Sequence, residues 1–194
     1  MHGLNPKPAP GRLNSVTQRF YDLVVPQAQM VLRVARCLLR DPGAADDLAQ
    51  ETMIKAYKAI DRFQEGTDVR AWLMTILRNA RIDFLRSAAA GVRDLSLDDS
   101  GIDPPDGSDN ESAWEHPQEL LERFSDDDVI AALQQLPEEI RWTLLLVDVE
   151  KIDHSQAAQV LEVPVGTIKS RAFRGRAMLR KTLLPLARQR HWID

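Results

Sequence analysis

The stretch that decides the fold is residues 153–176, which read DHSQAAQVLEVPVGTIKSRAFRGR. Asp153 and Gln156 fit a capping box that begins a short helix ending near Leu161. Pro164 then begins a second, longer helix, because a proline in the first turn loses no hydrogen bond. Two helices joined by about three residues have the spacing of a helix-turn-helix motif.

The second helix of this motif is basic on the side that faces away from its partner. The inward positions of the two helices are Ala157, Ala158, Leu161, Ile168, Ala172 and Leu179, and the outward positions of the second are Lys169, Ser170, Arg171, Phe173 and Arg174. In a helix-turn-helix such outward residues contact base edges in the major groove and backbone phosphates. The spacing therefore favours DNA binding over a solvated basic helix packed on a neighbour.

The charges of the chain are segregated, which its net charge of −4 conceals. Residues 94–128 hold 13 acidic residues against Arg123 alone, a charge of −12, so the rest of the chain carries +8. Residues 163–193 contain eight basic residues and no acidic one. A basic segment behind an acidic one indicates a polyanionic partner for that part of the chain.

Composition excludes several classes of protein. The 194 residues are 44% hydrophobic, which favours a globular chain over a disordered one. The densest apolar run, residues 144–147, is far shorter than the ~18 residues of a membrane span. Cys37 is the only cysteine, which excludes an intramolecular disulfide and a multi-cysteine zinc site. We expect a soluble, cytoplasmic protein without membrane insertion.

Residues 14–87 are expected to form a first helical domain after a disordered N-terminus of residues 1–13. Apolar residues recur at helical spacing, and Asp41-Pro42 provides an N-cap with proline in the first turn. Three amphipathic helices can share one core. The expected buried positions are Phe20, Leu23, Val24, Met30, Val31, Val34 and Leu38 in the first helix, Leu48, Thr52, Ala56, Ile60 and Phe63 in the second, and Val69, Trp72, Leu73, Ile76 and Ala80 in the third, from about Asp68 to Ser87.

Residues 88–125 read as a flexible acidic linker rich in Gly, Pro, Ser and Asp, with a short helix expected within residues 114–124. A second domain, residues 126–190, begins after an N-cap at Ser125 and contains helices to about Gln135, over residues 137–149 and over the two helices of the motif. Pro185 marks a point where the last helix could be interrupted. With no alternating strand pattern in the sequence, the chain is predicted to be all-α with two helical domains.

Two sets of residues resemble the extracytoplasmic-function (ECF) sigma factors of the sigma-70 family. Residues 163–171, followed by Arg174-Gly175-Arg176, are similar to their region 4 helix-turn-helix. The first domain is similar to their region 2 at Arg40-Asp41, Asp46-Asp47-Leu48, Gln50-Glu51-Thr52, Ala56-Tyr57, Phe63, Ala71-Trp72-Leu73, Ile76, Arg78-Asn79, Asp83 and Arg86. The resemblance covers about residues 18–87 and 126–184, in the order that the family has.

This resemblance implies an alternative sigma factor that directs core RNA polymerase to specific promoters. It implies that region 2 recognises and melts the minus-10 element, that region 4 reads the minus-35 element, and that an anti-sigma factor is a partner. The implied site residues are Asp47, Gln50 and Glu51 for core polymerase; Phe63, Thr67, Arg78, Asn79, Arg81 and Arg86 for the minus-10 element; and Lys169, Ser170, Arg171, Phe173, Arg174 and Arg176 for the minus-35 element.

Several positions have a second interpretation. Trp72 is expected in the core rather than as a stacking platform, and Phe63 is equally suited to packing and to lining a base pocket. The linker is either an inert tether or, as in the family, threads through the polymerase cleft. Glu162 stands where the family usually has glycine and needs a positive φ if the turn is unchanged. His154 replaces a common aromatic and is expected at a surface or interface.

A stand-alone helix-turn-helix regulator with a helical sensor domain is the alternative function. Such regulators commonly dimerise on palindromic sites. The sequence shows no paired carboxylates, nucleophile with its base, metal-ligand cluster or phosphate-binding glycine loop. We therefore expect no enzyme, no catalytic residue, no metal or cofactor, and no small-molecule substrate.

Overall fold

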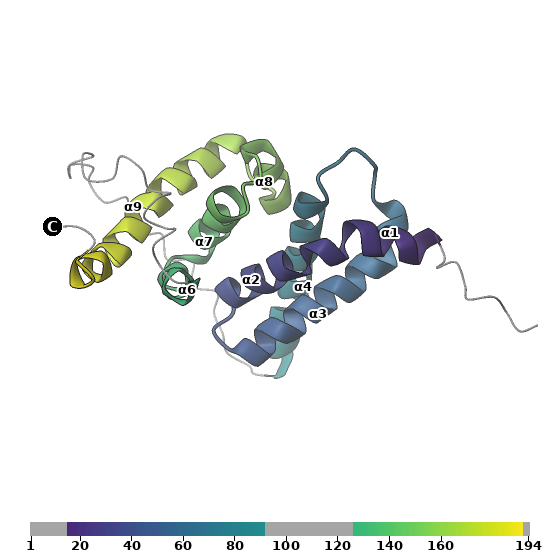
Figure 1. Cartoon of the computed structure of the whole chain (residues 1–194), viewed down its shortest axis with the longest axis horizontal. Coiled ribbons are helices and arrows are strands. Elements are labelled where there is room, and N and C mark those ends of the chain that lie inside the picture. The colour runs from purple at the N-terminus through teal and green to yellow at the C-terminus, as the bar shows by residue number, and fades with distance from the viewer. Residues whose placement is uncertain (1–14, 92–125, 192–194) are drawn as a thin grey trace, which may run out of the picture.

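The computed structural model describes residues 15–91 and 126–191, which form two helical lobes lying side by side (Figure 1). The first lobe contains α1 (Ser15–Leu23), the 3-10 turn η1 (Val25–Gln27), α2 (Ala28–Leu38), α3 (Pro42–Ala59), η2 (Ile60–Arg62) and α4 (Val69–Gly91). The second lobe contains α6 (Asp126–Gln134), α7 (Glu138–Leu144), the π-helix η4 (Leu145–Val149), α8 (His154–Leu161) and α9 (Val165–Gln189). No strand occurs within these two ranges, and the predicted all-α fold with two helical domains is confirmed.

The core of the first lobe lies where the helical spacing predicted it along α3. All five predicted positions on this helix and the turn after it are buried, from Leu48 to Phe63. Thr52 is buried without cost because its hydroxyl donates a hydrogen bond to the Leu48 carbonyl at 2.7 Å. Asp41 caps the helix as predicted, and its carboxylate accepts from the Ala44 N–H at 2.7 Å.

Two details of the first lobe differ from the prediction. The first helix is broken into α1 and α2 at η1, because Pro26 has no N–H to continue the helical ladder. On α4 the buried residues are Leu73, Met74, Leu77, Ala80 and Arg81, while the predicted Val69, Trp72 and Ile76 are only half-buried. The second lobe also packs against α4, so the covered face of this helix is wider than one core requires.

The bounds of two helices also differ. Helix α4 continues through Gly91, past its predicted end near Ser87, because the residues that follow include three alanines, the strongest helix formers. Helix α9 runs uninterrupted through Pro185, since Leu183 and Ala187 on either side of it are buried in the core. The predicted N-terminal segment, the Ser125 cap, the short helix within residues 114–124 and the path of the linker beyond Gly91 lie outside the described residues.

Candidate nucleic-acid interface

The helix-turn-helix is formed by α8 and α9, as the sequence predicts. Asp153 caps α8 with a carboxylate that accepts from the Ser155 N–H at 2.7 Å, and the Ser155 hydroxyl donates to the same carboxylate. These hydrogen bonds lower the pKa of Asp153. His154 is half-buried at the first position of this helix. The buried positions Ala157, Ala158, Ile168, Ala172 and Leu179 join the two helices, with Leu161 half-buried beside them.

Glu162 adopts the left-handed conformation that the motif requires of its turn. Its φ is 57° and its ψ is 43°, although it carries a side chain where glycine would be unstrained. The N–H of Val163 donates to the Ala158 carbonyl at 3.1 Å, which closes the C-terminus of α8. The predicted positive φ is confirmed, and the turn keeps the geometry of a helix-turn-helix.

The predicted minus-35 residues divide into two groups on α9. Lys169 and Ser170 are exposed, and Phe173 is 71% exposed. Arg174 is half-buried. These four residues share the outer face of the first turns of the helix, where a recognition helix contacts bases.

The other two minus-35 residues turn back toward their own lobe. Arg171 lies 3.9 Å from a carboxylate oxygen of Glu139 on α7. Arg176 forms hydrogen bonds of 2.7–3.2 Å with Asp148 in η4, and this hydrogen-bonded carboxylate raises the pKa of Arg176. Both arginines thus brace α9 against the helices behind it.

Two of the predicted minus-10 residues lie in the segment between α3 and α4. Phe63 is buried, its ring 5.1 Å from that of Trp72, and its carbonyl accepts from Arg19 at 2.6 Å. Thr67 is exposed beside Gly66, whose φ of 87° turns the chain, and the Thr67 hydroxyl donates to the Gln64 carbonyl at 2.7 Å.

The remaining minus-10 residues lie on α4. Arg78, Asn79 and Arg86 line an open depression of about 390 Å³ together with Ile82, Asp83 and Glu162. Asn79 is exposed. Arg81 is buried and forms a bidentate ion pair with Glu138 of α7. The structure therefore brings three of these four residues to one surface and places Arg81 between the lobes.

The predicted polymerase-binding residues Asp47, Gln50 and Glu51 are all exposed on the outer face of α3. Ile54 and Tyr57, which are 48% and 44% exposed, extend the same face toward the C-terminal end of the helix. Sequence reasoning did not assign these two residues to the face. Ile54 lies four residues after Gln50 and three after Glu51, and Tyr57 lies three after Ile54, and this helical spacing is the signal that could have found them. The face thus combines carboxylates with exposed apolar groups.

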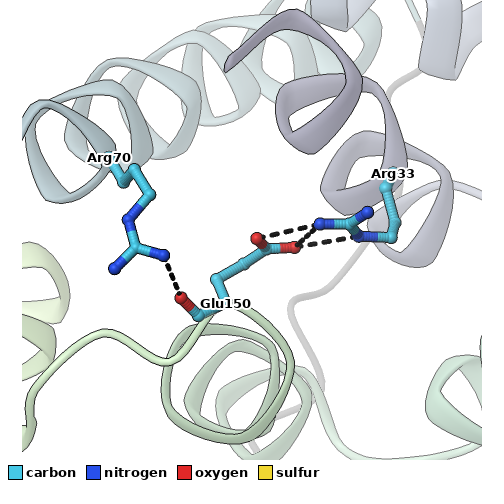
Figure 2. Close-up of polar contacts among 3 residues, drawn as sticks. All are labelled: Arg33, Arg70 and Glu150. Carbon is cyan, nitrogen blue, oxygen red and sulfur yellow. Dashed lines mark hydrogen bonds and ion pairs between the residues drawn. The ribbon is translucent and has the colours of Figure 1, made fainter. Parts of the chain in front are cut away.

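A polar centre between the lobes was not predicted. Glu150, only 4% exposed, follows η4, and Figure 2 shows its side chain facing Arg33 of α2. Arg33 donates three hydrogen bonds of 2.8–3.0 Å to the Glu150 carboxylate, and Arg70 of α4 donates to its carbonyl at 2.8 Å. Burial raises the pKa of Glu150, while the hydrogen bonds from Arg33 oppose the rise. No sequence signal could have linked these residues, because they are 80 to 117 positions apart.

The described residues contain neither a cluster of metal ligands nor a membrane-spanning helix. Among the side chains that the structure places, no three His, Cys, Asp or Glu residues gather as a metal site. None of the helices in residues 15–91 and 126–191 is long and apolar enough to cross a membrane.

Comparison with known proteins agrees with the order of the two lobes. Residues 23–90 match the family Sigma-70 region 2, and residues 126–179 match Sigma-70, region 4. The RNA polymerase sigma-H factor of Pseudomonas aeruginosa is 32% identical over 182 residues, which span 92% of this chain and 93% of that protein. The ECF RNA polymerase sigma factor EcfG of Rhodopseudomonas palustris is 36% identical over 70% of this chain and 68% of its own length.

A solved structure agrees with these relatives. The sigma factor RpoE of Bartonella quintana, in its co-crystal structure with the anti-sigma factor NepR, superposes with a TM-score of 0.66 at 26% identity, covering 86% of this chain and 97% of that one. Both halves of the chain, in order and over nearly its full length, therefore have sigma-factor counterparts. The chain belongs to the sigma-70 family, in its extracytoplasmic-function group.

Proposed function

We propose that this chain directs core RNA polymerase to specific promoters by contacting two promoter elements with two separate lobes. The observation that carries the proposal is the presence of two candidate DNA surfaces, one on each lobe. One is the outer face of α9 at Lys169 and Phe173, and the other is the depression at Arg78, Asn79 and Arg86. A stand-alone regulator needs only the first of these surfaces.

The second lobe is proposed to read the minus-35 element in double-stranded form. The first turns of α9 enter the major groove, where Lys169 and Arg174 contact phosphates or guanine edges. The exposed ring of Phe173 suits apolar contact with a thymine methyl group. Arg171 and Arg176, held by Glu139 and Asp148, fix the angle of the helix and add positive charge nearby.

The first lobe is proposed to bind one strand of the melted minus-10 element. The exposed Asn79 amide has both a donor and an acceptor, so it can pair with the Watson–Crick edge of an unstacked base. Arg78 and Arg86, which line the same depression, neutralise phosphates of the same strand. Arg81 is proposed to contact phosphates too once it is released from Glu138. Phe63 and Thr67 shape the segment that precedes α4, where the strand would enter.

The outer face of α3 is proposed to dock on core polymerase. The exposed carboxylates of Asp47 and Glu51 suit pairing with arginines of a partner, and Gln50 adds hydrogen bonds. Ile54 and Tyr57 provide the apolar contact area that a stable interface needs. By this proposal the chain works in the cytoplasm as an initiation factor rather than as an enzyme, and an anti-sigma factor, like the partner in the Bartonella quintana co-crystal structure, controls it.

The proposal is tested by run-off transcription with purified core polymerase. The templates are promoters that were selected by binding from a pool of random DNA. We expect specific initiation only when this chain is added, because core polymerase alone lacks promoter contacts. The control is core polymerase with no added chain. If the chain binds duplex DNA but never supports initiation, the proposal is wrong and the stand-alone regulator is the better description.

Replacing the exposed amide on α4 tests the role of the first lobe. We expect Asn79→Ala to reduce open-complex formation about tenfold on duplex promoters, since a base-edge contact is worth about 1–3 kcal/mol. Stability is expected to be unchanged because Asn79 is exposed. Permanganate footprinting of the melted strand measures the effect. Gln29→Ala, which removes an exposed amide from α2 of the same lobe, is the matched control, and equal promoter melting by both variants contradicts the assignment.

A further inference from the structure

Three glutamates of the second lobe are paired with three arginines of the first. Glu150 pairs with Arg33, Glu138 with Arg81 and Glu162 with Arg78. Every one of these ion pairs crosses between the lobes, and in each the positive charge belongs to the first lobe. In these three pairs the second lobe supplies the carboxylates and the first lobe supplies the guanidinium groups.

Two of the three arginines are the residues proposed to hold the phosphates of the minus-10 strand. Arg78 donates to a carboxylate oxygen of Glu162 at 2.9 Å, and an Arg81 nitrogen donates to Glu138 at 2.8 Å. Glutamate carboxylates here occupy the hydrogen-bonding positions that phosphate oxygens would need, because arginine binds both groups with the same planar fork. Glu162 also forms one wall of the depression that contains Asn79.

We infer that the second lobe acts as an internal mimic of nucleic acid, which masks the minus-10 surface of the first lobe until the lobes separate. The inference rests on the proposed function of Arg78 and Arg81, and adds to it that the free chain is held closed by its own residues. Opening of the lobes lets phosphates replace the carboxylates of Glu138 and Glu162 and frees the depression beside Asn79.

The three pairs contribute unequally to closure. Glu162 is 71% exposed at its side chain, so its pair with Arg78 is screened by water and contributes little to holding the lobes. The Glu150 side chain is only 5% exposed, and its Arg33 partner compensates a charge that is otherwise cut off from water. Burial raises the pKa of Glu150 even with Arg33 in place, so losing Arg33 makes burial of that carboxylate still less favourable. The pair of Glu150 with Arg33 is therefore the main ion pair that holds the lobes together, and we call it the clasp. Glu138 and Glu162, which occupy Arg81 and Arg78, are together called the mask.

Further contacts hold the same arrangement. The Gln134 amide of α6 donates to the carbonyls of Arg36 and Leu39 at 2.8 and 3.3 Å, across the lobe boundary. The buried apolar residues of both lobes form one continuous cluster rather than two. Closure is thus built from packing and polar contacts together, and the charged pairs decide how readily it is released.

The clasp is tested by fluorescence energy transfer in the full chain, labelled at Lys58→Cys and Lys181→Cys, one exposed position in each lobe. The native Cys37, which is buried in the closed form, is replaced by alanine in every labelled chain so that opening cannot expose a third thiol. We expect Arg33→Ala to raise the ratio of open to closed chains at least about tenfold, because it leaves Glu150 as an uncompensated buried charge. Adding Glu150→Gln removes that charge and is expected to restore most of the energy transfer. Unchanged transfer in Arg33→Ala, or no recovery in the double variant, overturns the clasp.

The mask is tested by binding of a single-stranded minus-10 oligonucleotide, taken from a promoter selected above, to the free chain. We expect Glu138→Gln with Glu162→Gln to bind the oligonucleotide about tenfold more tightly, since Arg78 and Arg81 lose their internal competitors. The matched control is Glu139→Gln. It removes the carboxylate next to Glu138, but the arginine near Glu139 is Arg171 of the same lobe. Equal affinity of the double variant and this control overturns the mask. If a chain that fails here still supports run-off transcription, the proposed function stands and only the masking is wrong.

Discussion

The double variant Lys169→Ala with Arg174→Ala is expected to abolish dependence on the minus-35 element while leaving polymerase binding intact. Both residues lie on the outer face of the first turns of α9. Each direct contact to a base edge is worth about 1–3 kcal/mol, so two losses weaken promoter binding roughly a hundredfold.

Transcription from promoters with and without a minus-35 element measures this effect. The matched control is Lys181→Ala with Arg188→Ala, which removes the same charge from exposed positions farther along the same helix. We expect the control to lose only a small, sequence-independent part of DNA affinity. If both double variants lose the same affinity on both promoters, α9 contributes general charge and does not read the element. If polymerase binding fails together with DNA binding, the assignment of α9 to DNA is wrong.

Gly175→Val is expected to destabilise the second lobe by about 2–3 kcal/mol, which lowers its melting temperature by roughly 8–24 °C. A Cβ atom at this position would lie 2.7 Å from Cγ2 of Ile140 and 2.9 Å from Cγ of Leu144. Helices α7 and α9 thus cross at a point where only glycine fits. The penalty of glycine inside a helix, about 0.5–1 kcal/mol against alanine, is outweighed here by close packing.

Thermal unfolding followed by circular dichroism tests the crossing. Gly166→Ala is the matched control on the same helix, because a Cβ at Gly166 meets no atom within 4 Å. We expect this control to be neutral or to gain up to about 1 kcal/mol, since alanine favours the helix. Equal melting of the two glycine variants contradicts the proposed crossing. A Gly175→Val chain is also expected to lose minus-35 recognition, because α7 and η4 orient α9 through the crossing.

The proposed DNA surfaces of the two lobes differ in whether closure covers them. In the closed arrangement the outer face of α9 remains exposed at Phe173, whereas Arg78 and Arg81 are engaged by carboxylates. The chain is therefore expected to bind duplex minus-35 DNA more readily than single-stranded minus-10 DNA until polymerase separates the lobes. Docking of the α3 face on polymerase does not require opening, because Asp47, Gln50 and Glu51 are exposed in the closed form.

The helix-turn-helix and α3 were predictable in detail. Asp41 and Asp153 cap α3 and α8 as their residue types indicate, and the buried stripe of α3 has the predicted positions. Glu162 takes the positive φ that its place in the motif demands. These features depend on neighbours within a few residues, so the local pattern contains the information. The DNA and polymerase roles of the individual site residues stay predictions.

The sequence alone determined which residues of α3 are buried, where α3 and α8 begin, and that two helical lobes flank an acidic segment. The tertiary structure alone decided that Glu150 meets Arg33, that Arg81 is buried against Glu138, and that α4 is covered on a wider face than one core needs. The physical reason is the range of each signal. Helical periodicity contains information on residues three and four positions apart. A pairing across 117 positions depends instead on how the surfaces of the folded lobes fit together.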